Sequence, residues 1–200
     1  MIVIGLTGGI LTGKSTVSEM LAEKGAVIID ADKIGHEAYQ PETTVWQEVV
    51  DAFGNDILKG NGEIDRKKLG EIVFNDPEAL ARLNSIMHPR MHSMIREEIE
   101  GLSGEGVDLV VLEAAVLIEA NWTDLVEEVW VTVAPEETAV KRLQNRGGLS
   151  EEQARARIRS QLPAEERAKH ADVIVDTDCD LAEVRAKVEE LWRRLQAQRG

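Results

Sequence analysis

The chain alternates between short, largely apolar runs and longer stretches in which apolar residues recur every three or four positions. The apolar runs lie at 2–6, 26–30, 108–114, 128–134 and 172–177. Short apolar runs without regular polar alternation are typical of strands buried on both faces of a parallel sheet. The helical spacing between the runs favours a doubly wound α/β fold, in which helices cover a five-stranded parallel sheet.

The uneven spacing of the runs indicates how the chain is divided. The gap between the second and third runs is far longer than one crossover helix needs. It contains helical patterns, one of which opens with Pro77 at a first helical position. We therefore predict a mostly helical insertion at 36–100, beside the carboxyl edge of the sheet, where ligands bind in such folds. The core would then consist of 1–35, 101–140 and 170–200.

The remaining segment, 141–169, is basic in an acidic chain. It holds eight arginines and lysines against four glutamates, whereas the whole chain has 37 acidic and 23 basic residues and a formal net charge of −14. The glycines at 147–148 can end one helix, and Ser150 with Gln153 can form a capping box for the next. An arginine-rich helical hairpin of this kind suits a two-helix lid that closes over a polyphosphate. The alternative is a pair of solvated helices with ion pairs along each helix.

The composition argues against several classes of partner. An acidic surface repels phosphate backbones, so we expect no nucleic-acid partner. The single cysteine, Cys179, allows neither an internal disulfide nor a cysteine cluster for zinc. No apolar run approaches the ~20 residues of a spanning helix, and no basic stretch with a cleavage site precedes the first strand. We expect a cytoplasmic protein without a membrane partner, and we favour a monomer.

A glycine-rich stretch, GGILTGKST at 8–16, joins the first strand to a stretch with helical spacing. This phosphate loop matches G-x-x-x-x-G-K-[ST] through Gly8, Gly13, Lys14 and Ser15. In this context consecutive backbone N–H groups form a nest for an anion at the positive end of a helix. Lys14 can neutralise the β- and γ-phosphates, and the Ser15 hydroxyl can ligate Mg²⁺. The flanking strand and helix distinguish the loop from a chance glycine-rich turn, so we predict that it binds a nucleotide.

Leu11 is an unusual residue for the middle of the phosphate loop. Many such loops carry glycine here, which adopts φ > 0 freely. A leucine held in that conformation costs about 1–2 kcal/mol. Leu11 therefore either keeps a negative φ or carries strain at a functional site. Because the nest uses backbone groups, we expect phosphate binding in both cases.

Acidic residues stand at the ends of two predicted strands. Phosphoryl transfer needs a carboxylate that accepts or orients the proton of the attacking hydroxyl. Asp30 and Asp32 follow the second strand, and Asp32 is our candidate for this base; the alternative is that it caps the next helix. Glu113 ends the third strand and is the candidate for holding Mg²⁺ through water. Glu119 is its rival and, with His88, a candidate substrate contact.

Seven ordered segments of the chain are similar to one known family. They read IGLTGGI-x-TGKSTVS, IIDADKIGHEAY, FGNDIL with GEIDRKKLGEIVF, LNSIMHPRM, EAAVLIEANW, RLQNRGGLSEEQARARIRSQ and ADVIVDT. Together they resemble the dephospho-coenzyme A kinases along essentially the whole chain. The resemblance implies a P-loop kinase core, a helical coenzyme-A-binding insertion and a two-helix lid. It also implies transfer of the γ-phosphoryl group of MgATP to the ribose 3′-hydroxyl of dephospho-coenzyme A, the last step of coenzyme A synthesis.

The resemblance also implies roles for residues at matching positions. Asp32 matches the family's proposed base, and Arg142 matches its lid arginine near the transferring phosphoryl group. The residues expected to bind ATP are Gly8, Gly9, Leu11, Thr12, Gly13, Lys14, Ser15, Thr16 and Arg146. Three positions depart from the family pattern: Leu11 replaces glycine or alanine, His36 replaces a frequent arginine, and Thr177 replaces a common asparagine.

Two other classes of protein share the phosphate loop. A different small-molecule P-loop kinase, such as a nucleoside monophosphate kinase, is disfavoured by the DAD segment at 30–32 and the HP segment at 88–89. The other class is a regulatory NTPase that binds partners instead of phosphorylating a metabolite. The sequence lacks the NKxD motif of guanine recognition, which disfavours a GTPase.

Overall fold

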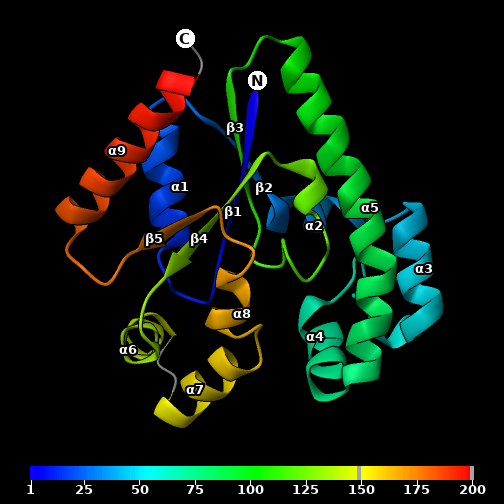
Figure 1. Ribbon diagram of the computed structural model, residues 1–200. Coiled ribbons are helices and arrows are strands. Elements are labelled where there is room, and N and C mark those ends of the chain that lie inside the picture. Colours follow the sequence, from blue (N-terminus) through cyan, green and yellow to red (C-terminus); the bar gives the residue numbers. More distant parts are fainter. Residues whose placement is uncertain (148–149, 199–200) are drawn as a thin grey trace. The chain divides into compact units, whose positions relative to one another are not determined.

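The computed structural model, which describes residues 1–147 and 150–198, contains a five-stranded sheet with the strand order β2-β3-β1-β4-β5 (Figure 1). The strands are β1 Ile2–Gly8, β2 Val27–Asp30, β3 Leu109–Glu113, β4 Glu128–Val133 and β5 Val173–Asp176. Each coincides with one of the five apolar runs. The predicted five-stranded parallel α/β sheet is therefore confirmed.

The register of the strands determines which residues meet at the carboxyl edge of the sheet. The central strand β1 pairs in parallel with β3, where Leu6 is opposite Glu113, and with β4, where Gly8 is opposite Thr132. Strand β4 pairs in parallel with β5. From Val3 onward β1 is buried, as its apolar sequence predicts. The start of the phosphate loop, Glu113 and Thr132 therefore share one edge.

Helices from both ends of the chain cover one face of the sheet. Helix α1 spans Lys14–Ala22 and helix α9 spans Leu181–Gln198, and the two lie side by side (Figure 1). Their apolar positions pack with sheet residues in one core cluster, which includes Leu6, Val17, Leu21, Trp130, Val184, Val188 and Leu195. The helical spacing along each segment thus supplies the apolar face that the sheet requires.

The lid segment, 141–169, has more helices than predicted. Helix α6 spans Glu136–Gly147, helix α7 spans Glu151–Arg159, and a short helix α8 spans Ala164–Ala168. The predicted capping box of Ser150 and Gln153 is present at the start of α7. The two-helix interpretation omitted α8, a five-residue helix that has too few positions to show a periodic pattern. Gly148, part of the predicted end of α6, lies outside the described residues.

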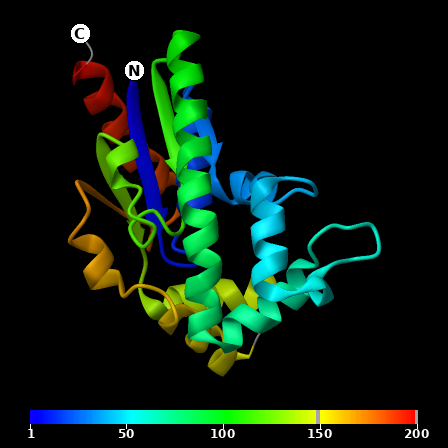
Figure 2. The ribbon, with the colours of Figure 1, turned by 90° about the vertical axis from the view of Figure 1, so that its right-hand side faces the viewer.

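The chain divides into two compact units, 1–29 with 103–200 and 30–102. The predicted insertion, 36–100, lies within the second unit, and the lid segment lies within the first. The helices of the second unit are α2 Ala31–Ala38, α3 Thr44–Phe53, α4 Arg66–Asn75 and α5 Pro77–Gly104, which runs on into the first unit; a 3-10 turn, Asn55–Ile57, follows α3. Helix α5 continues without interruption through Pro89 (Figure 2). Another 3-10 turn, Thr123–Leu125, precedes β4. Among the described residues no helix is both long and apolar enough to cross a bilayer.

Candidate active site

The phosphate loop ends at the start of α1, and Gly13 is the N-cap residue of that helix. Gly13 has φ 88° and ψ 11°, a left-handed conformation that glycine adopts at little cost. Within the described part of the chain no side chain caps α1, and its first turn contains no acidic residue. The free N–H groups and the positive end of the helix dipole therefore suit an anion.

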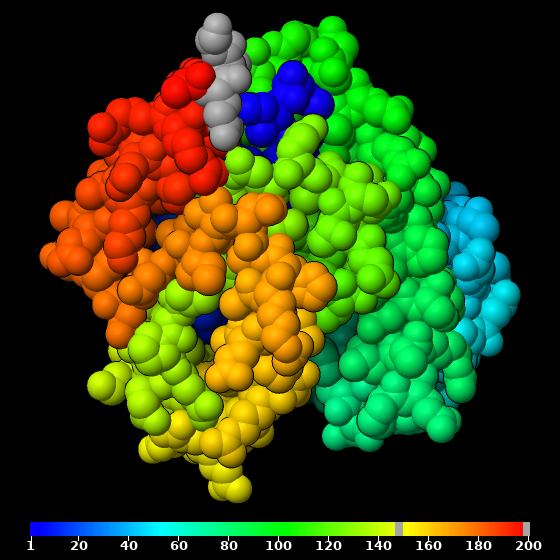
Figure 3. Space-filling model, viewed as in Figure 1, coloured from blue at the N-terminus to red at the C-terminus, as the bar shows by residue number. Residues whose placement is uncertain are grey.

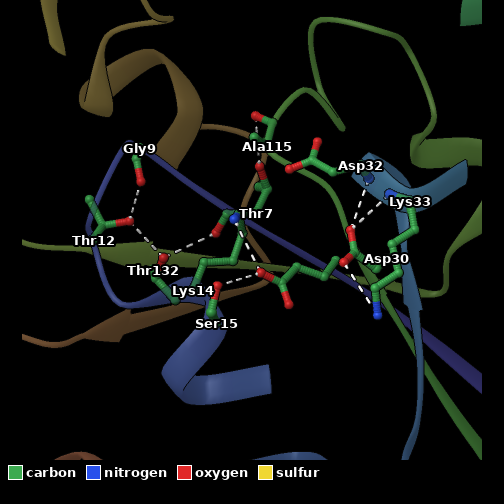
Figure 4. A network of polar contacts seen from close by, with 11 residues as sticks. Thr7, Gly9, Thr12, Lys14, Ser15, Asp30, Asp32, Lys33, Ala115 and Thr132 are labelled. Atoms are coloured by element: carbon green, nitrogen blue, oxygen red, sulfur yellow. Dashed lines mark hydrogen bonds and ion pairs between the residues drawn. The ribbon is translucent and has the colours of Figure 1, made fainter. Parts of the chain in front are cut away.

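Buried hydroxyl groups hold the phosphate loop against β4. The Thr12 and Thr132 hydroxyls lie 2.8 Å apart, and Thr12 also donates to the carbonyl of Gly9 at 2.9 Å (Figure 4). A Cβ atom at Gly8 would lie 2.1 Å from the Thr132 hydroxyl, so the glycine allows this close approach. Thr132 was missed from the sequence, because a threonine in an apolar strand gives no sign that its hydroxyl meets a loop far away in the chain.

Arg142 and Thr177 hold the other side of the phosphate loop. The Thr177 hydroxyl donates to the carbonyl of Thr12 at 2.8 Å. Arg142 donates through Nη1 to the carbonyl of Leu11 at 3.1 Å and through Nη2 to the carbonyl of Thr177 at 2.8 Å. Arg142 therefore contacts the loop backbone in this structure. Its expected position near a transferring phosphoryl group stays a prediction.

Leu11 has φ 56°, so the strained alternative of the two considered for this residue is the observed one. The expected cost of this conformation is about 1–2 kcal/mol. The side chain is half-buried and packs against the cluster formed by Val140, Leu143 and Ala154 of α6 and α7. Complete burial of a leucine side chain stabilises by about 1.5–3 kcal/mol, so the partial burial of Leu11 offsets part of this cost.

Lys14, Ser15 and Glu113 come together at the mouth of the phosphate loop. Glu113 Oε1 lies 3.3 Å from Lys14 Nζ and accepts a hydrogen bond from the Ser15 hydroxyl at 2.9 Å (Figure 4). Ser15 and Glu113 are the two predicted metal-binding residues, and both offer oxygen donors, which Mg²⁺ prefers. The described residues contain no group of three or more His, Cys, Asp or Glu side chains that could hold a metal ion. Phosphate and water oxygens would have to complete the shell, as is usual for nucleotide-bound Mg²⁺.

Glu119 is engaged elsewhere in the first unit. It accepts a hydrogen bond from Arg167 Nη2 at 3.1 Å, and Arg167 is only 2% exposed. Of the two rival acids, Glu113 is the one beside Ser15. The burial of Arg167 was not predicted, because the sequence gives no sign of its contact with Glu119, 48 positions earlier.

Two arginines of α7 form ion pairs with glutamates. Arg155 contacts Glu136, Glu137 and Glu151 at 2.7–2.9 Å, and Arg159 contacts Glu136 at 3.3 Å. The hydrogen bond from Arg155 lowers the pKa of Glu136 below its ordinary value. Only the contact of Arg155 with Glu151 runs along one helix, as the ion-pair alternative has it; the other contacts join α7 to α6. Arg146 is exposed at the end of α6, and its contact with ATP stays a prediction.

In the second unit, Asp30 and Asp32 have different roles. Asp30 Oδ1 accepts hydrogen bonds from the N–H groups of Asp32 at 2.9 Å and Lys33 at 3.3 Å, so Asp30 is the cap of α2 (Figure 4). Asp32 is exposed in the first turn. Its backbone carbonyl lies 2.5 Å from Nδ1 of His36, but among the described residues its carboxylate is assigned no hydrogen bond. The helix-cap alternative therefore applies to Asp30.

His88 lies inside α5, directly before Pro89, and is half-buried. Thr16 lies in the first turn of α1 and is also half-buried. Nothing in either environment tests the predicted contact with the acceptor or with ATP. Both assignments stay predictions.

A family model described as dephospho-CoA kinase matches residues 2–183 of the chain. The chain belongs to the dephospho-CoA kinase family. A dephospho-CoA kinase of Carboxydothermus hydrogenoformans is 48% identical over 93% of this chain and 90% of its own length. Among solved structures, the dephospho-CoA kinase from Campylobacter jejuni matches with a TM-score of 0.74 and 32% identity, over 99% of this chain and 98% of that one. The predicted family and the kinase activity are therefore confirmed.

A more distant structure supports the fold alone. A shikimate kinase from Bacteroides thetaiotaomicron is 15% identical and matches with a TM-score of 0.58 over 98% of both chains. The predicted P-loop kinase fold is thus shared with kinases of other families.

Proposed function

We propose that this chain transfers the γ-phosphoryl group of ATP to the ribose 3′-hydroxyl of dephospho-coenzyme A, with Mg²⁺ as cofactor. Membership of the family supports the reaction. The arrangement of Lys14, Ser15 and Glu113 at the phosphate loop is the observation that carries the proposed donor site. The cytoplasmic location and the monomeric state remain predictions.

On the donor side, the chain binds the phosphates and neutralises their charge. The backbone N–H groups at the uncapped start of α1 hold the phosphate oxygens. Lys14 turns from Glu113 to the β- and γ-phosphates, where a positive charge lowers the barrier to transfer. The Ser15 hydroxyl, and the Glu113 carboxylate through water, would hold Mg²⁺, which would supply further charge neutralisation.

On the acceptor side, Asp32 accepts or orients the proton of the attacking hydroxyl. Its carboxylate is exposed and is not used as a helix cap, since Asp30 serves that purpose. A carboxylate without internal hydrogen bonds is available for a substrate hydroxyl. The other proposed contacts are unchanged: Arg142 and Arg146 contact the phosphates, and His88 and Glu119 contact the acceptor.

The substitution Asp32→Asn tests this assignment. We expect kcat to fall by ~10²–10⁴, the usual range for loss of a general base, with little change in the affinity for ATP. The low end applies if the loose transition state needs positioning more than proton transfer. The matched control is Asp30→Asn, two residues away, because asparagine also caps helices well and kcat should stay near the wild-type value. An Asp32→Asn variant that binds the acceptor normally and turns over within a few-fold of wild type contradicts the role.

The acceptor is tested by a coupled assay of ADP release. Dephospho-coenzyme A should support turnover at low concentration, whereas nucleoside monophosphates should not. Turnover of a nucleoside monophosphate in preference to dephospho-coenzyme A would favour the rival kinase class. ADP release that needs no added acceptor would favour an NTPase.

A further inference from the structure

The two residues at the tip of the phosphate loop, Ile10 and Leu11, pack against the lid helices. Their side chains contact an apolar cluster made of Val140 and Leu143 from α6 and Ala154 from α7, all at most 6% exposed; Ile158 packs against the same cluster. The phosphate loop and these helices are far apart in the chain. All of them belong to the first compact unit.

Polar contacts hold the same two loop residues. The N–H group of Ile10 donates to Oε1 of Gln161 at 2.7 Å, and the carbonyl of Leu11 accepts from Arg142 at 3.1 Å. Because Gln161 occupies the N–H group of Ile10, that group cannot join the anion nest. The first N–H group of the loop tip that remains for a phosphate belongs to Leu11.

Of the two apolar side chains, only Ile10 lines the cavity next to the loop tip. A cavity of about 370 Å³ lies between the phosphate loop, α6 and residues 158–167, and Ile10 lines it while Leu11 does not. In the space-filling view the first part of the chain, in dark blue, is visible between α6 and α8 (Figure 3). A substitution of Leu11 therefore changes the packing on the α6–α7 cluster and leaves the lining of this cavity unchanged.

With glycine at position 11, the left-handed backbone conformation would not depend on packing against the lid helices. Glycine adopts φ 56° at almost no cost. Leucine is held there against its own preference, so its conformation depends on the packing that opposes the strain. Packing and backbone conformation are thus linked at this residue.

We propose that Leu11 is a positioning residue: its side chain, packed on the α6–α7 cluster, keeps the phosphate loop in the conformation that binds ATP. The inference rests on the proposed ATP site. It adds that the affinity of the loop for ATP depends on the packing of the Leu11 side chain on the lid helices. Gln161 and Arg142 support the same arrangement through the backbone on either side of that side chain.

Three substitutions separate strain from packing. Leu11→Ala removes the packing and keeps the strain, Leu11→Gly removes both, and Leu11→Met keeps most of the packing. We expect the temperature of unfolding without ATP to fall most for alanine, less for glycine and least for methionine. If φ at position 11 were negative, the Leu11→Gly variant would instead be less stable than the Leu11→Ala variant. This order tests the packing without any reference to nucleotide binding.

Calorimetric titration with ATP tests the functional consequence. We expect Leu11→Ala to bind ATP about tenfold more weakly, which corresponds to about 1.4 kcal/mol, and Leu11→Met to recover most of that affinity. The loss should appear in the Kd and KM for ATP more than in kcat. The matched control is Leu181→Ala, the same change at a leucine that is 60% exposed in α9, and it should leave ATP affinity unchanged.

Two results would overturn the inference. One is an alanine variant that binds ATP as tightly as wild type, and the other is a glycine variant less stable than the alanine variant. Failure of the proposed function is a different result. Wild-type enzyme that binds ATP, with these variants in the expected order, but does not phosphorylate dephospho-coenzyme A would refute the reaction and leave the role of Leu11 intact.

Discussion

Replacing Gly13 with alanine is expected to destabilise the protein by about 2–5 kcal/mol, from two separate causes. The left-handed conformation at Gly13, with φ 88°, costs an L-residue about 1–2 kcal/mol. The new Cβ atom would also lie 2.9 Å from Cγ2 and 3.0 Å from Oγ1 of Thr177. Thr177 is 3% exposed and hydrogen-bonded to Thr12 and Arg142, so it cannot move freely. Overpacking of this kind adds about 1–3 kcal/mol.

Urea denaturation of four proteins measures the two causes separately. They are wild type, Gly13→Ala, Thr177→Ala and the double variant, arranged as a double-mutant cycle. In the Thr177→Ala background the contacts with Cγ2 and Oγ1 are gone and the contact with Cβ at 3.1 Å remains. The cost of Gly13→Ala should therefore fall toward about 1–2 kcal/mol, the cost of the strain. The free energy lost with the Thr177 hydrogen bonds is the same for Thr177→Ala and for the double variant, so it cancels when these two proteins are compared. An equal cost in the two backgrounds would refute the overpacking, and a cost near zero in wild type would refute the strained conformation.

Two further predictions concern Lys14 and Glu136. Lys14→Ala should lower kcat by ~10²–10³ while circular dichroism shows an intact fold, because it removes a positive charge from the transferring group; near-normal kcat would contradict the phosphate-loop assignment. Arg155 lowers the pKa of Glu136 from 4.5, so this pairing stabilises the protein above about pH 4.5 and is lost as the pH falls through the lower folded value. The difference in unfolding free energy between wild type and Glu136→Gln should therefore shrink below about pH 4.5, and a difference independent of pH would rule out this linkage.

The sheet could be predicted closely because burial and sequence correspond there. Strands β1 and β3 are buried along most of their length, so the interiors of their runs are apolar. Parallel strands bring their carboxyl ends to one edge, so Glu113 and the phosphate loop were expected at the same edge. Their contact also requires β3 to lie next to β1, and this strand order was not predicted. The predicted metal-binding pair needed no knowledge of side-chain packing.

The conformation of Leu11 could not be predicted, because it depends on residues distant in the chain. Its carbonyl is bound by Arg142, 131 positions later, and its side chain packs on residues of the same helix and of α7. A local sequence pattern contains no information about such contacts. From the sequence, φ of Leu11 could therefore only be expected to be either negative or positive and strained.

The arginines of the lid segment illustrate a similar limit. Their number predicted a binding surface for polyphosphate, but a count does not reveal partners. Arg155 pairs with Glu136, 19 positions earlier, and Arg167 pairs with Glu119, 48 positions earlier. These contacts arise when helices from different parts of the chain pack together. Charge counted within one segment therefore overstates the number of cations available to a ligand.

The uncapped start of α1 has a consequence for the whole protein. A helix whose first N–H groups lack partners is incomplete, and within the described residues no side chain completes α1. The phosphates of a bound nucleotide would serve as the missing cap, so folding and binding would share one free energy. At a nucleotide concentration of about 100 times Kd, this linkage adds about 2.7 kcal/mol to the stability of the folded state. Resistance to unfolding and proteolysis would then rise and fall with the supply of adenine nucleotide in the cell.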